Sequence, residues 1–207
     1  MAFVAACTAT FAAEVVWQHS LNAGGSWQCT LFSMQAKYTP SIVLHFQLWR
    51  LLTSAFLHNG FLHLFWNCFS ILMIGFTAER EMPRKEFLTL LGVGTLGANL
   101  ASAVFKPYTI GVGASGTIFA LMGVIAVWYW LNQERLGPNK YIFLAFFILI
   151  GIFTVMNVFS AASVDFYCHI GGFVTGAPLA ILYLRPASSF DADRYVPHHA
   201  HAALPNC

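Results

Sequence analysis

Residues 113–131 read Gly-Ala-Ser-Gly-Thr-Ile-Phe-Ala-Leu-Met-Gly-Val-Ile-Ala-Val-Trp-Tyr-Trp-Leu, a serine followed by a long apolar run. As a helix rising about 1.5 Å per residue, the run from 116 to 131 would be about 24 Å long. Because the hydrocarbon core of a bilayer is about 30 Å thick, such a helix would cross most of it and leave Ser115 several Å below the membrane surface. The stretch therefore predicts a membrane-spanning helix that begins at a serine.

The composition of the whole chain agrees with that prediction. Of the 207 residues, 58% are hydrophobic and only 9% are charged, whereas a typical soluble domain is about 25% charged. A soluble fold of this size could not keep so much apolar surface away from water, but a membrane protein exposes such surface to lipid. We therefore predict a multi-pass integral membrane protein.

Other bulk features exclude several classes of partner. The formal net charge is only +2 and no basic cluster is longer than three residues, so we expect no nucleic-acid binding. The five cysteines are scattered without a CxxC spacing, which favours free, packed thiols over a disulfide framework or a zinc site. We expect neither a metal nor another cofactor.

Charged residues and turn formers divide the chain into six apolar runs. We predict one all-α domain of six transmembrane helices over residues 1–185, followed by a polar and poorly ordered tail over 186–207. The first run contains Glu14 and has no basic leader, which favours a span over a signal peptide. The connection over 19–48 is apolar enough to predict a loop that lies partly in the membrane. The six runs cover roughly 1–18, 51–77, 87–105, 116–131, 141–160 and 166–184.

The basic residues predict which way the helices point, because Lys and Arg are retained on the cytoplasmic side. With six spans, most of these residues fall on one side, and Ser115 and His169 both face the opposite, outer side. The basic residues on the cytoplasmic side are Arg80, Arg84, Lys85, Arg135, Lys140, Arg185 and Arg194, against Lys37, Arg50 and Lys106 on the outer side.

Ser115 and His169 are the candidate catalytic pair, since a serine hydroxyl activated by an imidazole is a nucleophile for acyl transfer. Each also has a structural interpretation, Ser115 as a helix N-cap and His169 as a hydrogen-bonding residue between spans. Small residues four apart on the fourth and sixth runs predict close packing of these two helices, which would bring hydroxyl and imidazole within hydrogen-bonding distance. These small residues are Gly116, Ala120, Gly172, Gly176 and Ala180.

A second polar pair, His63 and Asn67, shares one helix face near the outer end of the second run, because residues four apart lie one above the other. Together with the backbone N–H of Ser115, these side chains could donate to the oxyanion of a tetrahedral intermediate. Interhelical hydrogen bonding without a catalytic role is an equally good interpretation of the two residues.

The residues just before Ser115 and His169 carry two further expectations. Residues 107–113 contain Gly, Pro and Thr and are expected to be non-helical, which at membrane depth requires cover by protein or a water-filled cavity. Asp165 is expected to cap the sixth run and to lie exposed near the outer surface. It is therefore not expected to orient the His169 ring as the third member of a triad.

Taken together and in order, the motifs resemble those of the rhomboid family of intramembrane serine proteases, from about residue 40 to 184. Two positions depart from the family's pattern. Cys168 stands where alanine is usual, and Phe119 stands where many members have a tyrosine, so Phe119 can pack on the imidazole but offers no hydroxyl. The motifs are Trp49-Arg50, His58 with His63-Leu-Phe-Trp-Asn67, Gly113-Ala-Ser-Gly116 and His169-Ile-Gly-Gly172-Phe-Val-Thr-Gly176.

The resemblance implies a serine endopeptidase with a Ser115–His169 dyad and an oxyanion held by His63 and Asn67. Its substrates would be single-span membrane proteins within the lipid bilayer, cut near the outer end of the span. The main alternative is a catalytically silent rhomboid-like protein that binds membrane clients, although silent relatives typically lose one residue of the dyad. A transporter is less favoured, because the sequence has no paired halves with interrupted spans. The implied supporting residues are Gly113, Gly116, Phe119, Gly172, Gly176, Trp49 and Arg50.

Overall fold

The computed structural model describes residues 1–21, 24–136, 141–142, 144–145, 147–149 and 164–183. Every regular element in these ranges is a helix, and the strand-like pairing among them is one isolated antiparallel bridge between Lys37 and Gly111. The predicted all-α class is therefore confirmed for this part of the chain. The elements are α1 (Ala2–Ser20), α2 (Trp27–Ser33), α3 (Thr39–Leu44), α4 (Arg50–Thr53), the 3-10 helix η1 (Ser54–Phe56), α5 (Phe61–Ser70), the π-helical η2 (Ile71–Gly75), α6 (Phe76–Glu81), α7 (Arg84–Phe105), α8 (Ser115–Leu136) and α10 (Phe166–Tyr183).

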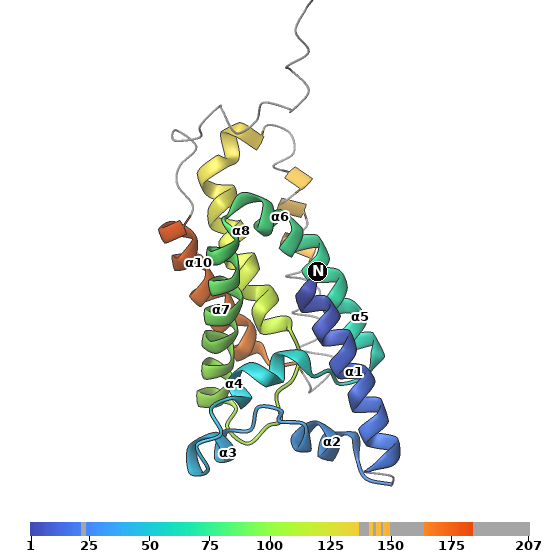
Figure 1. Ribbon diagram of the computed structural model, residues 1–207. Coiled ribbons are helices and arrows are strands. Elements are labelled where there is room, and N and C mark those ends of the chain that lie inside the picture. Colours follow the sequence, from blue (N-terminus) through green and yellow to red (C-terminus); the bar gives the residue numbers. More distant parts are fainter. Residues whose placement is uncertain (22–23, 137–140, 143, 146, 150–163, 184–207) are drawn as a thin grey trace, which may run out of the picture.

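Two of these helices, α7 and α8, are long and apolar enough to cross a bilayer, over Arg84–Phe105 and Ser115–Asn132. Shorter apolar helical stretches cover Phe61–Gly75 and Phe166–Leu182. In Figure 1 the long helices run in roughly the same direction, and α2 and α3 lie across one end. Most of the predicted fifth run and the whole predicted tail lie outside the described residues, so the count of six spans stays a prediction.

The second apolar run does not form one helix from residue 51 to 77, as its composition suggested. Its first part forms the short helices α4 and η1, and α5 begins only at Phe61. Between them Gly60 has a φ of +95°, in the left-handed region that glycine adopts without a Cβ clash. This break places His58 in a turn outside the helix and His63 in the first turn of α5.

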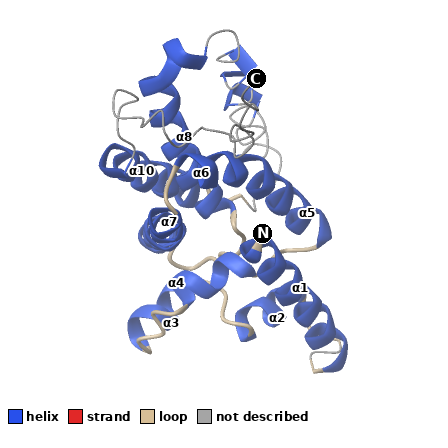
Figure 2. Ribbon diagram, turned by 45° about the horizontal axis from the view of Figure 1, so that its top comes forward, coloured by secondary structure: helices blue, strands red, loops and turns tan. Residues whose placement is uncertain are grey.

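The helices α7, α8 and α10 pack against one another, and Figure 2 shows α7 nearly end-on with α10 beside it. A Cβ added at Gly172 would overlap the carbonyl oxygen of Gly116, and one added at Gly176 would overlap the carbonyl oxygen of Ala120. Only hydrogen at these two positions lets the backbones approach so closely. The predicted contact between the small-residue faces of α8 and α10 is confirmed.

Within its described residues, the connection over 19–48 contains two short helices, α2 and α3, where the sequence predicted a loop. Its second half exposes large apolar side chains, with Val43 61%, Leu44 70% and Phe46 78% exposed. Because these side chains are apolar and lie on a protein with membrane-length helices, their exposure is consistent with a connection that lies partly in the lipid.

Candidate functional site

Ser115 is the first residue of α8 and follows a non-helical segment over 106–114, as predicted. Near the end of this segment, Gly113 has a φ of +112°, in the left-handed region. A Cβ at Gly113 would also lie 2.6 Å from Cε1 of His63. Both the backbone conformation and the close neighbour therefore require glycine two residues before Ser115.

His169 lies in the first turn of α10 with its imidazole against the ring of Phe119. The two ring centroids are 4.2 Å apart and the ring planes are inclined by 8°. Because Phe119 stands one turn after Ser115 on the same face of α8, the stack places His169 at the Ser115 end of that helix. Gly116 brings the helices together there, since a Cβ on it would lie 2.7 Å from Sγ of Cys168.

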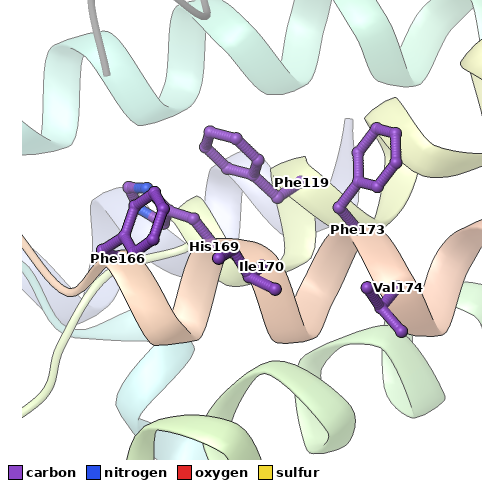
Figure 3. A pocket seen from close by; sticks show the side chains of 6 residues that line it. All are labelled: Phe119, Phe166, His169, Ile170, Phe173 and Val174. Carbon is purple, nitrogen blue, oxygen red and sulfur yellow. The ribbon is translucent and has the colours of Figure 1, made fainter. Parts of the chain in front are cut away.

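The imidazole of His169 is buried, and its Nδ1 has no hydrogen-bond partner among the described residues. Within the same part of the chain no hydrogen bond joins the ring to the Ser115 hydroxyl. The structure thus brings the two residues to one end of the α8–α10 contact without a direct bond between them. Figure 3 shows the ring beside an apolar cavity of about 170 Å³. The cavity is lined by Phe119, Phe166, His169, Ile170, Phe173 and Val174.

His63 and Asn67 reach the same segment from α5. A Cβ at Gly113 would lie 2.8 Å from Nε2 of His63 and 3.7 Å from Nδ2 of Asn67. The backbone N–H of Asn59 donates to Nδ1 of His63 over 3.2 Å. Since Nδ1 is then the acceptor of a neutral ring, Nε2 carries the proton and presents it toward Gly113. His63 therefore directs an N–H group at the loop that precedes Ser115. Nδ2 of Asn67 lies near the same loop and donates to the carbonyl of His63 over 2.8 Å.

Asp165 caps α10 as predicted, because its Oδ1 accepts from the backbone N–H of Cys168 over 3.1 Å. Its Oδ2 accepts from the hydroxyl of Ser102 on α7. The expected exposure to water was wrong. Asp165 is half-buried, because its carboxylate packs against Ser102 where α10 meets α7. Neither of these two contacts involves the His169 ring.

The Trp49-Arg50 pair fixes the connection before α4. Nη1 of the buried Arg50 donates to the carbonyls of Phe32 at 3.0 Å and Ala36 at 2.8 Å. Its guanidinium carbon also lies 4.8 Å from the Phe32 ring centroid. Trp49 is half exposed and donates to the side chain of Gln35 over 2.9 Å. Arg50 thus binds carbonyl groups at and just after the C-terminal end of α2. None of these contacts of Trp49 and Arg50 involves Ser115 or His169.

Lys37 is a residue at this site that the sequence did not single out. It is fully buried, and its Nζ donates to the carbonyls of Lys106 at 2.9 Å and Thr109 at 3.2 Å. Its backbone exchanges two hydrogen bonds with Gly111, of 3.0 and 2.9 Å. Burial lowers the pKa of the ammonium from its ordinary value. The 19–48 connection therefore holds the segment that leads to Ser115.

These observations define the class of the protein. It is a helical membrane protein in which a serine, two histidines and an asparagine lie at one end of the helix bundle, namely Ser115, His63, His169 and Asn67. Residues 45–186 match the Rhomboid domain, and the chain belongs to the rhomboid family, whose members are integral multi-pass membrane proteins. The sequence-based assignment to this family is confirmed.

Several relatives are similar over most of this chain. Rhomboid-like protease 3 of Toxoplasma gondii is 33% identical over 159 residues, which cover 74% of this chain and 58% of that protein. RHOMBOID-like protein 4 of Arabidopsis thaliana is 32% identical over 78% of this chain and 41% of its own length. Rhomboid protease GluP of Bacillus subtilis is 31% identical over 82% of this chain and 33% of its own. The chain spans about half the length of the curated relatives it matches.

Proposed function

We propose that this chain is an intramembrane serine endopeptidase that uses Ser115 as nucleophile and His169 as general base. The observation that carries the proposal is the Phe119–His169 stack, with ring centroids 4.2 Å apart, one helical turn from Ser115. The family adds support, since relatives such as Rhomboid-like protease 3 are named as proteases.

In this mechanism His169 accepts the proton of the Ser115 hydroxyl as the oxygen attacks the scissile carbonyl, and later returns it to the leaving amine. The carbonyl oxygen becomes an oxyanion in the tetrahedral intermediate. Nε2–H of His63 and an N–H of Asn67 lie against Gly113 and are assigned to this oxyanion, together with the backbone N–H of Ser115. Donors fixed before the reaction stabilise such an intermediate strongly in a site of low dielectric constant.

The proposed setting is a six-span domain with the dyad toward the outer side of the membrane. The substrates are single-span membrane proteins cut in or near the outer end of their transmembrane segment. A helix hides its carbonyls in its own hydrogen bonds, so the segment must unwind locally, and small or helix-breaking residues near the cut are favoured. The apolar cavity beside His169 suits a substrate that arrives from lipid with apolar side chains.

A fluorophosphonate probe tests the proposal on the full chain in detergent or proteoliposomes. We expect the wild-type chain to be labelled and to cleave a transmembrane reporter. Both the labelling and the cleavage should disappear in Ser115→Ala and in His169→Ala. An inert chain that still captures the reporter would instead favour a silent rhomboid-like protein that binds membrane clients.

A further inference from the structure

We propose that Glu14 of α1 is a positioning residue for the oxyanion donors, a role that rests on the proposed function and concerns the same site. Glu14 is fully buried. An ionisable side chain in an apolar helix is costly to bury and marks a functional site by default. Nothing in the dyad or in the donors of the tetrahedral intermediate uses this carboxylate directly.

The contact of Glu14 is with the turn before α5. Its Oε1 accepts from the backbone N–H of His58 over 3.0 Å. The carbonyl of His58 accepts from the backbone N–H of Gly60 at 2.9 Å and from Nε1 of Trp27 at 3.3 Å. The backbone of His58 is therefore held at both its N–H and its carbonyl, and Glu14 supplies the only bond at the N–H among the described residues.

The next peptide along the chain acts on His63. The N–H of Asn59 donates to Nδ1 of His63 over 3.2 Å, so that the proton of the neutral ring sits on Nε2. The His58 ring adds a second restraint, since it meets the His63 ring edge-on with centroids 5.4 Å apart. If the turn shifts when Glu14 is lost, the Asn59 N–H no longer fixes the tautomer of His63, and Nε2 of His63 moves relative to Gly113.

The 3-10 helix η1, which leads into this turn, is bonded to the loop before Ser115. The carbonyl of Ser54 accepts from the backbone N–H of Gly113 over 2.9 Å. Residues 54–60 thus hold Gly113 on one side and His63 on the other, and Glu14 fixes the middle of this segment. In this proposal Glu14, which is far from the dyad in sequence, sets the distance between Nε2–H of His63 and the loop that contains Gly113.

Two substitutions separate the hydrogen bond from the charge. Glu14→Ala removes the acceptor and leaves the His58 N–H buried without a partner. Glu14→Gln keeps Oε1 as acceptor. Its amide nitrogen replaces Oε2, which has no hydrogen-bond partner in the described part of the chain, so the exchange breaks no bond. We expect kcat to fall about 10- to 100-fold in Glu14→Ala with KM little changed, and to stay within a few-fold of wild type in Glu14→Gln.

A double-mutant cycle tests whether Glu14 acts through His63. In a His63→Ala background, Glu14→Ala should cost no further activity, because the donor it positions is already gone. Fully additive losses would overturn the proposal. The matched control is Gln18→Ala, one turn further along α1. It removes the bond that Gln18 accepts from the Thr30 hydroxyl and the bond that Gln18 donates to the carbonyl of Gly25, and it should leave kcat unchanged.

A spectroscopic measurement makes the outcome independent of turnover. In the full chain labelled with ¹⁵N-histidine, the His63 signals are assigned by their loss in His63→Ala. We expect a single tautomer with the proton on Nε2 in wild type and in Glu14→Gln, and a mixture of tautomers in Glu14→Ala. An unchanged tautomer in Glu14→Ala would overturn the positioning role. A wild-type chain that neither labels nor cleaves would overturn the proposed function alone.

Discussion

The ring of Phe119 lies flat on the imidazole of His169, with centroids 4.2 Å apart and planes inclined by 8°. Phe119→Ala should therefore let the imidazole turn away from Ser115, and we expect kcat to fall about 10-fold or more. Phe119→Tyr keeps a ring in the stack and should remain within a few-fold of wild type. Cleavage of a transmembrane reporter in proteoliposomes measures both, and equal activity of the alanine variant would mean that the stack does not hold the histidine.

Removing either member of the dyad should abolish proteolysis without unfolding the protein. Ser115→Ala and His169→Ala each delete a group that takes part in bond making, so loss by several orders of magnitude is expected. Thermal unfolding followed in the same detergent should give a Tm close to that of wild type. Reporter cleavage by Ser115→Ala at a near wild-type rate would contradict the assignment of the nucleophile.

Gly172→Val should impair activity although Gly172 is not a reacting group. Its Cβ would overlap the carbonyl oxygen of Gly116, so α10 must move away from α8 and carry His169 with it. A displacement of about 1 Å costs roughly 10²-fold. Gly92→Val on α7 is the matched control, because a Cβ there meets nothing within 4 Å. Undiminished activity in Gly172→Val would show that the two helices tolerate a wider separation.

The features predicted correctly from the sequence are those that repeat along a helix. Gly172 and Gly176 are four residues apart, and this spacing alone predicts a small face that a second helix can approach. The motifs around Ser115 and His169, which led to the correct family assignment, likewise depend on local spacing, while the catalytic roles of the two residues stay a prediction. The second run was misjudged because apolar composition does not reveal a break, whereas the left-handed backbone of Gly60 ends one helix and starts another.

The buried contacts of Lys37 and Glu14 were missed for a different physical reason. Each is a single charged residue, and its partners are backbone groups far away in sequence, such as the carbonyl of Lys106 and the N–H of His58. Backbone groups are present at every position, so no sequence pattern marks which of them will bind a buried charge. The burial of Asp165 escaped prediction in the same way, because it depends on Ser102 of another helix.

Lys37→Met should destabilise the fold and disturb the Ser115 segment together. The variant loses the bonds from Nζ to the carbonyls of Lys106 and Thr109, and hydrogen bonds of charged groups contribute about 1.5–3 kcal/mol each. We expect a clearly lowered Tm and reduced labelling by a fluorophosphonate. Lys85→Met, at an exposed position on α7, serves as the control for loss of a positive charge. A Tm unchanged from wild type in Lys37→Met would indicate that the two carbonyls find other donors.

The Asp165 carboxylate separates a dyad from a triad. Asp165 accepts from the Cys168 N–H through Oδ1 and from the Ser102 hydroxyl through Oδ2, so both oxygens are engaged away from the His169 ring. Asp165→Asn keeps the capping oxygen, and its amide nitrogen can donate to the Ser102 oxygen in place of the bond that is lost. Turnover should stay within a few-fold of wild type. A kcat lowered by about 10⁴, the scale seen when a triad aspartate is amidated, would contradict the dyad and make Asp165 a catalytic residue.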